Sequence, residues 1–209
     1  MSSSRQRADV IPLTVFTVGH STRTIEEFVH LLKAHSIEHV IDVRSIPRSR
    51  HNPQFNRDQL PAALQRFGIT YSHMPGLGGR RHARRDSPNT GWRNLSFRGY
   101  ADYMETPAFT ESLNRCIALA HDDRVALMCA EAVPWRCHRS LIADALLARG
   151  VEVSDITSAM HVRPYSLTSW ARIRGADVTY PRASFETAQV SEARKSKGAR
   201  YVDDGEKQP

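Results

Sequence analysis

The sequence is poor in lysine, in cysteine and in long apolar runs, and each shortage excludes a class of protein. Its 29 basic residues comprise 25 arginines and only 4 lysines. Three cysteines are an odd number and no export signal accompanies them, so a structural disulfide framework is not expected. No apolar run has the length of a membrane span, and residues 1–16 lack the apolar core and cleavage site of a signal peptide. We therefore expect a cytoplasmic protein with no membrane partner.

Positive charge is the main compositional feature that the sequence does have. The formal net charge is +7 at pH 7. A positive surface attracts phosphates, nucleic acid and acidic metabolites. Because a GC-rich genome would also encode arginine in place of lysine, the arginine excess supports an anionic partner only modestly.

Alternating strand-like and helix-like patterns predict one α/β domain over residues 10–165. We expect strands at 13–18, 39–43, 69–74, 124–129 and 151–156, separated by helices at 25–32, 57–67, 97–104, 107–120 and 140–150. Strands that alternate with helices form parallel βαβ units. The expected fold class is therefore a mostly parallel sheet flanked by helices, in a Rossmann-like three-layer arrangement. Residues 1–9 are expected to be a disordered lead, and residues 166–209 an extension with a polar tail.

Polar segments follow three of the expected strands. They are "GHS" at 19–21, "DVRSIPRSR" at 42–50 and "CAEAVPWRCHR" at 129–139. Ligands of open α/β sheets bind outside the carboxyl ends of the strands, so we expect these segments to meet at one edge of the sheet. An Arg-rich loop at 75–98 has no periodic pattern, and loops of that length are usually functional lids or disordered.

Together these segments resemble a bacterial family, the domain of unknown function 488. The motifs that carry the resemblance are "TVGHS", "DVRSIPRSR", "YSHMPGLGG" and "CAEAVPWRCHR", in this order over roughly residues 14–160. The resemblance implies a compact α/β fold with a site built from these motifs, and it supplies no established reaction. The matching positions are Gly19, His20, Ser21, Asp42, Arg44, Pro47, Ser49, Leu77, Gly78, Cys129, Glu131, Pro134, Cys137, His138 and Arg139.

Cys137, His138 and Arg139 lie at the start of an expected helix. Free backbone N–H groups and the helix dipole favour an anion there and push a thiol towards thiolate. His138 is a candidate proton donor or acceptor, and Arg139 a candidate clamp for a phosphate or carboxylate. We therefore name Cys137 and His138 as candidate catalytic residues and Arg139 as a candidate anion-binding residue. In the alternative, Cys137 packs under the helix and Arg139 pairs with Asp42 or Glu131.

Cys129 and Glu131 complete the catalytic candidates. Cys129 ends a strand, so its side chain faces either the edge of the sheet or the core. Glu131 lies in the loop that follows, where its carboxylate needs Arg44 or Arg139 as a partner or else acts as a base. Cys116 falls on the apolar face of a helix, and we expect it in the core.

The segments after the first two strands supply further candidates for binding an anion. These candidates are His20, Ser21, Asp42, Arg44 and Ser49. Asp42 and Arg44 alternate along a strand and share a face, which favours an ion pair between them. Gly19 lets the backbone beside His20 approach a ligand closely.

Three other cysteine chemistries compete with this interpretation. A cysteine-phosphatase loop needs arginine after five intervening residues, and Trp135 and Ala143 stand at that distance from Cys129 and Cys137. Zinc stays an alternative that would use both cysteines and His138, with His20 as a candidate fourth ligand, but the spacing is unusual and we assign no metal ligand. A redox pair of the two cysteines also stays open, with seven residues between them.

The leading hypothesis is an enzyme with a Cys/His/Glu/Arg site at the strand-end edge, acting on an anionic, nucleotide-like or nucleic-acid substrate. The Arg-rich loop, which also carries Trp92, has a composition that fits phosphate contacts and base stacking. The alternatives are a non-catalytic nucleic-acid or anion-binding module and a metal-binding protein. The cofactor and the oligomeric state stay unassigned.

Overall fold

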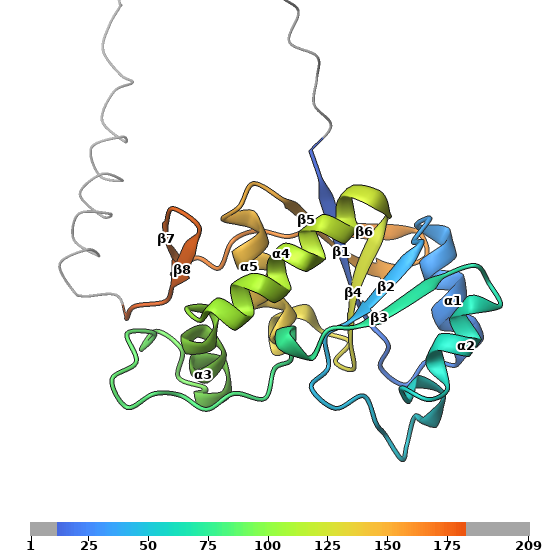
Figure 1. Cartoon of the computed structure of the whole chain (residues 1–209), viewed down its shortest axis with the longest axis horizontal. Coiled ribbons are helices and arrows are strands. Elements are labelled where there is room, and N and C mark those ends of the chain that lie inside the picture. Colours follow the sequence, from blue (N-terminus) through green and yellow to red (C-terminus); the bar gives the residue numbers. More distant parts are fainter. Residues whose placement is uncertain (1–11, 183–209) are drawn as a thin grey trace, which may run out of the picture.

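A computed structural model of the chain describes residues 12–182 (Figure 1). The expected disordered lead, residues 1–9, lies outside the described residues, as does the part of the polar tail at 183–209. None of the helices in the described part is long and apolar enough to cross a membrane.

One six-stranded sheet forms the centre of the molecule, in the order β3-β2-β4-β1-β5-β6. The first five strands run parallel to their neighbours, and only β6 is antiparallel. The predicted fold class, a mostly parallel sheet with helices around it, is therefore confirmed. The strands are β1 (Thr14–Gly19), β2 (His39–Asp42), β3 (Thr70–His73), β4 (Val125–Cys129), β5 (Glu152–Ser158) and β6 (His161–Pro164).

Helices cover both faces of the sheet and enclose a separate apolar core on each. Helices α1 and α2 pack over one core, and α3, α4 and α5 over the other (Figure 1). The α-helices are α1 (Ile25–Ala34), α2 (Leu60–Gln65), α3 (Leu95–Met104), α4 (Pro107–Asp122) and α5 (Arg139–Leu147). Three short 3-10 helices are η1 (Pro53–Phe55), η2 (Pro75–Leu77) and η3 (Pro134–Arg136). A right-handed crossover that runs to one side along the sheet places its helix on one face, and a crossover that runs to the other side places its helix on the opposite face. This rule explains why the helices divide between the two faces.

Local signals account for the start of α1 but not for that of α2. Thr24 caps α1 in a capping box with Glu27, as its position before the apolar pattern indicates. The expected cap of the next helix, Asn56, instead accepts a hydrogen bond from the Ser49 backbone N–H at 2.6 Å. Helix α2 consequently begins at Leu60, later than the expected 57–67.

The point where the strand order reverses lies between β1 and β4. The chain leaves β1 towards β2 and leaves β4 towards β5, so the two connections run in opposite directions, over opposite faces of the sheet, from the carboxyl ends of adjacent strands. Pairing continues past the strands, because the His20 N–H donates to the Cys129 carbonyl at 2.9 Å. Gly19 is required here, since a Cβ atom would lie 2.1 Å from the Glu131 carbonyl oxygen. Ligand sites of open α/β sheets lie at such points.

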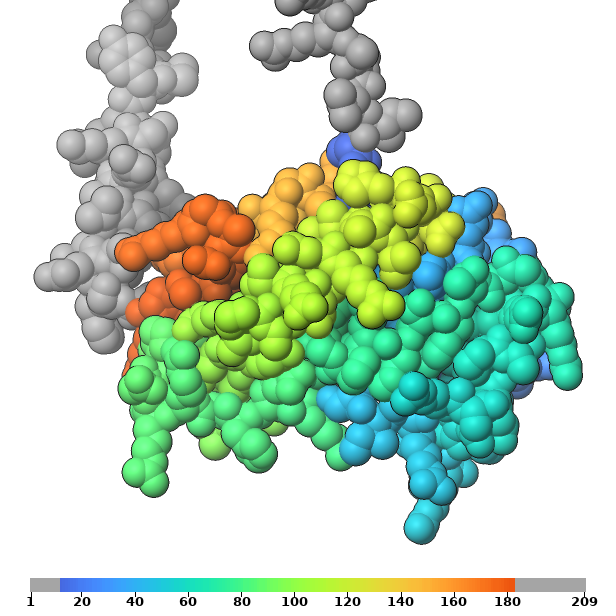
Figure 2. All heavy atoms as spheres, in the orientation of Figure 1, coloured from blue at the N-terminus to red at the C-terminus, as the bar shows by residue number. Residues whose placement is uncertain are grey.

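The described part of the C-terminal extension packs on the domain. Strands β7 (Arg172–Arg174) and β8 (Asp177–Thr179) form a small hairpin, drawn in orange in Figures 1 and 2. Tyr180 follows it and is fully buried, and its hydroxyl donates to the Asp144 carboxylate at 2.8 Å. Its backbone N–H donates to the Asn89 side chain at 2.8 Å. These bonds join the extension both to α5 and to the Arg-rich loop.

Candidate functional site

A cavity of about 340 Å³ opens at the carboxyl edge of the sheet, beside the point where the strand order reverses. Its walls come from the loop after β2, the Arg-rich loop with the start of α3, and the segment between β4 and α5. In Figure 2 the first two, in blue and green, adjoin at the lower edge of the molecule. The lining residues are Arg44, Ser45, Ile46, Gly79, Arg80, Ser96, Phe97, Cys129, Ala130, Glu131, Arg136, Cys137 and His138.

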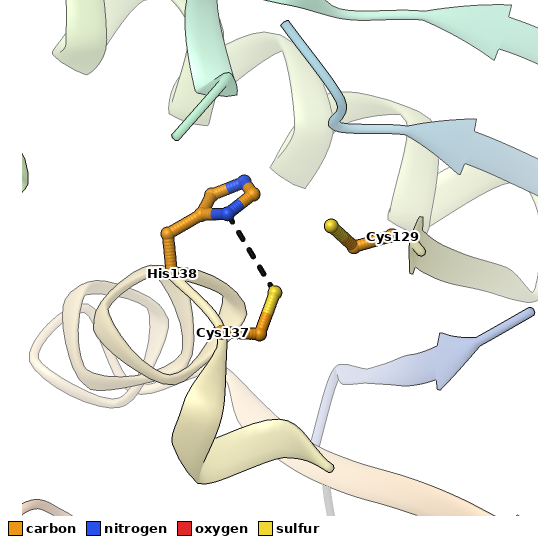
Figure 3. A group of neighbouring side chains, drawn as sticks. All are labelled: Cys129, Cys137 and His138. Atoms are coloured by element: carbon orange, nitrogen blue, oxygen red, sulfur yellow. Dashed lines mark hydrogen bonds between the residues drawn. The ribbon is translucent and has the colours of Figure 1, made fainter. Parts of the chain in front are cut away.

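Cys129, Cys137 and His138 face one another in this wall and, with Arg139, are called the thiol cluster below (Figure 3). The Cys137 sulfur lies 3.6 Å from Nδ1 of His138. The other ring nitrogen of His138 donates to the Val43 carbonyl at 3.0 Å. Because Nε2 therefore carries a proton, Nδ1 is the ring nitrogen that can accept a proton from the sulfur. The geometry is that of a thiol paired with an oriented base.

The pKa values of the two buried thiols are shifted in opposite directions. The Cys129 thiol is the largest influence that lowers the pKa of Cys137 well below its usual range, and His138 and Arg139 act in the same direction against burial. The pKa of Cys129 is raised, first by its hydrogen bond to Cys137 and then by burial. These shifts favour a proton on Cys129 and a thiolate at Cys137.

Arg139, the fourth member of the thiol cluster, has only 1% of its surface exposed. Its Nη2 donates to the Glu131 backbone carbonyl. Its Nε and Nη1 atoms are buried without a hydrogen-bond partner among residues 12–182. A buried guanidinium with free donors stabilises a negative charge next to it. Its charge lowers the pKa of Cys137 and partly offsets the rise in the pKa of Cys129.

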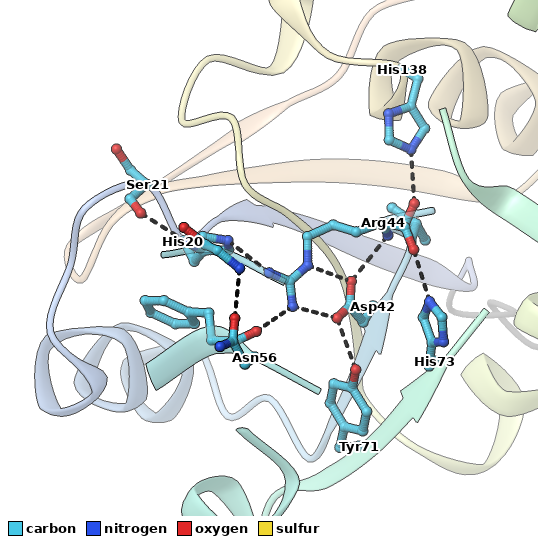
Figure 4. Close-up of polar contacts among 11 residues, drawn as sticks. His20, Ser21, Asp42, Arg44, Asn56, Tyr71, His73 and His138 are labelled. Carbon is cyan, nitrogen blue, oxygen red and sulfur yellow. Dashed lines mark hydrogen bonds and ion pairs between the residues drawn. The ribbon is translucent and has the colours of Figure 1, made fainter. Parts of the chain in front are cut away.

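A second polar group, the ion-pair cluster of His20, Asp42 and Arg44, lies beside the cavity (Figure 4). The expected ion pair is present and is bidentate, with Arg44 Nε and Nη2 donating to the Asp42 oxygens at 2.9 and 2.6 Å. Arg44 also donates to the Phe55 carbonyl at 2.7 Å, and Tyr71 donates to Asp42 at 2.8 Å. This network fixes the loop from which Val43 supplies its carbonyl to the thiol cluster.

His20 serves the ion-pair cluster and does not line the cavity. Arg44 Nη1 donates to its Nε2 at 3.1 Å, and its Nδ1 donates to the Ser21 carbonyl at 2.8 Å. The ring stacks on Phe55 with 4.1 Å between centroids. Burial, and then the charge of Arg44, lower the pKa of His20 to about 4, so the ring is neutral near pH 7.

The structure does not bring Glu131, Ser21 and Ser49 into either cluster. Glu131 lines the mouth of the cavity, but its side chain is exposed and accepts only a 3.4 Å contact from the Val133 N–H. Ser21 contributes its carbonyl to His20 from a left-handed backbone conformation with φ 51°. The Ser49 hydroxyl accepts the Asn52 N–H at 3.0 Å within its own loop.

Several lining groups were not among the sequence-based candidates. Arg80 and Arg136 add positive charge at the mouth of the cavity, and the Val43 carbonyl sets the tautomer of His138. Gly79 packs so close to the His138 ring that a Cβ atom would lie 2.4 Å from Nδ1. The motif "YSHMPGLGG" contains this glycine and was the only signal that pointed to it.

The fold and the site define a class of protein: an α/β domain with a thiol–imidazole pair at the strand-order reversal. A family model described as Domain of unknown function DUF488 matches residues 24–146, more than half of the 209-residue chain. The chain therefore belongs to this family, and the resemblance seen in its motifs is confirmed. Neither the curated proteins nor the solved structures that were searched contain a match.

Proposed function

We propose that the protein is an enzyme that uses Cys137 as a nucleophile on an anionic substrate held in the 340 Å³ cavity. The observation that carries the proposal is the contact of 3.6 Å between the Cys137 sulfur and Nδ1 of His138, together with the 3.0 Å bond that fixes the ring on Val43. In this arrangement the thiolate attacks an electrophilic atom of the substrate. His138 holds the thiol proton and returns it to the leaving group.

The charge around the cavity supports an anionic substrate. Arg80 and Arg136 line it, against a single carboxylate from Glu131, whereas the charge of Arg44 is already paired with Asp42. Arg139 does not line the cavity, but it adds a buried positive charge that acts on both cysteines, with two nitrogens that have no partner among the described residues. Planar guanidinium groups bind phosphate and carboxylate with paired hydrogen bonds, so these two groups are the substrate chemistries that fit.

A test that needs no known substrate compares two alkylating agents of equal size, neutral iodoacetamide and anionic iodoacetate. At about pH 6.5 few ordinary thiols are ionised, so we expect Cys137 to react at least roughly tenfold faster than free cysteine. We also expect the ratio of the iodoacetate rate to the iodoacetamide rate to be higher for Cys137 than for free cysteine. Mass spectrometry of the modified peptides identifies the residue.

Cys116 provides the internal control because it is fully buried in the core and burial raises its pKa to about 12. It should stay unmodified in the folded protein. Reaction of Cys137 no faster than that of free cysteine, with no preference for iodoacetate, would contradict the proposal. The alternative of a non-catalytic anion-binding module would then be favoured.

A metal site is the second candidate, because Cys129, Cys137 and His138 offer ligand atoms within 4.8 Å of one another. Two thiolates and one imidazole with an open fourth position form a donor set that zinc uses in catalysis. The bond from His138 to Val43 would orient such a ligand. The positive charge of Arg139 opposes it. Elemental analysis decides: one zinc per chain that protects both cysteines from alkylation would favour this candidate over the free thiolate.

A further inference from the structure

All three tryptophans of the chain line one further cavity, of about 540 Å³. They come from three distant segments: the Arg-rich loop, η3, and the chain that follows β6. The lining residues are Trp92, Trp135, Ser140, Arg163, Pro164, Tyr165, Ser166, Thr168 and Trp170, and we call this cavity the aromatic groove. No role in the proposed thiol chemistry explains this gathering of rings.

The rings of the aromatic groove are held in place yet partly open to solvent. Trp92 stacks on Phe97 at 4.8 Å and meets Trp170 edge-on at 5.0 Å. Trp170 is 39% exposed and Trp135 is 60% exposed. An indole that open to water gains little from folding, and such exposed aromatic surface commonly marks a binding site.

One arginine, Arg163, lines the aromatic groove, and its Nη2 lies 3.4 Å from the Asp155 carboxylate. The Arg163 guanidinium lies over the Trp135 ring, 5.0 Å from its centroid. A neighbouring cavity of about 400 Å³ shares Trp170 and is lined by Arg93, Arg98 and Arg182. No carboxylate of the described residues lines either cavity. The two adjacent cavities therefore combine aromatic faces with positive charges.

We propose that the aromatic groove binds a single-stranded nucleic acid, with bases stacked on Trp135 and Trp170 and phosphates on the adjacent arginines. Proteins that bind single strands combine these two features, because every base has a face that can stack and every linkage has a charge. A membrane surface would not enter a concave site, and an acidic peptide would leave the tryptophan faces unused. The net charge of +7 agrees with a polyanionic partner.

The aromatic groove adjoins the cavity of the thiol cluster. Trp135 directly precedes Arg136, which lines that cavity, and Trp92 stacks on Phe97, which also lines it. A strand bound in the groove would thus extend towards Cys137. The inference thus names the substrate class of the proposed enzyme. Only the approach of the strand to Cys137 rests on the proposed function, because binding in the groove requires no thiol.

The experiment uses intrinsic tryptophan fluorescence, because every tryptophan of the chain lines the groove. Full-length protein with Cys137→Ser is titrated with oligothymidylate and oligouridylate of about ten nucleotides, a length in the range that single-strand sites cover. We expect saturable quenching, and the two titrations distinguish DNA from RNA as the preferred strand. Trp135→Ala should weaken binding by roughly tenfold, whereas Trp135→Phe, which keeps a ring, should bind nearly as tightly as the parent.

Charge is tested separately with a matched pair of exposed arginines. Arg93→Ala should reduce the dependence of log affinity on log salt concentration by about 0.7, the value for one phosphate contact on a single strand. Arg115→Ala, on the exposed side of α4, should leave it unchanged. Absence of saturable quenching, equal quenching by inorganic polyphosphate, or full affinity in Trp135→Ala would each overturn the inference. None of these results depends on whether Cys137 is reactive.

Discussion

The two polar clusters at the carboxyl edge of the sheet differ in how completely their groups are paired. In the ion-pair cluster, both oxygens of Asp42 and all three nitrogens of Arg44 have partners, which include His20, Tyr71 and the Phe55 carbonyl. In the thiol cluster, Arg139 is just as deeply buried and two of its nitrogens have none among the described residues.

This difference separates a supporting network from a reactive one. A charge that is fully paired and hydrogen-bonded is stable in place and has nothing left to offer a substrate. An unpaired buried donor raises the free energy of the empty site, and an anion that binds there recovers that cost. This contrast supports the proposal that the ion-pair cluster positions the loop after β2 and the thiol cluster carries the chemistry, although both lie at the same edge.

The largest expected effect comes from breaking the ion-pair cluster. Asp42→Asn leaves the buried Arg44 charge uncompensated and should reduce the free energy of unfolding by about 3–5 kcal/mol. The free energy of unfolding is measured by urea denaturation. Asp86→Asn is the matched control, because Asp86 lies 3.8 Å from Arg84 with 88% of its side chain exposed, and it should not change the midpoint. Equal midpoints for the two variants would show that Asp42 is not essential to the network.

The next effect is the pH dependence that His20 gives to the ion-pair cluster. Its pKa falls from 6.5 to about 4 on folding, so between these values the unfolded chain binds a proton that the folded protein refuses. Stability is therefore complete above about pH 6.5 and is lost as the pH falls towards 4, by on the order of 3 kcal/mol. His20→Gln does not titrate and should lose correspondingly less over this interval in urea denaturation. If the unfolding free energy of His20→Gln fell with pH as steeply as that of the parent, a buried neutral His20 would be ruled out.

The sequence predicts the fold well where its signals are local. Apolar runs located β1 to β5, and Thr24 located the start of α1. The pattern did not reveal β6, because all four of its residues are exposed and an edge strand of this kind has no buried side to mark it. Asn56 misled for a different reason: its side chain accepts a hydrogen bond from the backbone N–H of Ser49, earlier in the same loop, and does not cap the helix.

The candidate site is predictable as a place but not as a set of contacts. The rule that polar groups gather at strand ends correctly brought His20, Asp42 and Cys129 to one edge. It could not assign partners, because the decisive acceptors are backbone carbonyls, Val43 for His138 and Glu131 for Arg139, and a carbonyl has no sequence signature. The aromatic groove was equally hidden, since its tryptophans meet only through long-range packing.

Within the thiol cluster, Cys129→Ala tests whether the second thiol sets the acidity of the first. Cys129 is the largest influence that lowers the pKa of Cys137, so its removal should slow alkylation of Cys137 at about pH 6.5 by roughly tenfold. At about pH 10 both proteins should react alike, because the thiolate is then formed in either case. Cys116→Ala removes a core cysteine outside the cluster and should leave the pH profile unchanged. A profile that Cys129→Ala does not shift would contradict a shared proton between the thiols.

The smallest expected effect on Cys137 is that of its histidine partner. His138→Gln removes the second-largest favourable influence on the Cys137 pKa, and the alkylation rate at about pH 6.5 should fall by roughly threefold, less than in Cys129→Ala. The preference for iodoacetate over iodoacetamide should persist, because Arg80, Arg136 and Arg139 still supply the positive charge. Rates measured against pH for both reagents distinguish these contributions. A parent-like profile would show that His138 neither shares nor returns the proton, whereas loss of the iodoacetate preference would show that the ring, not the arginines, attracts the anion.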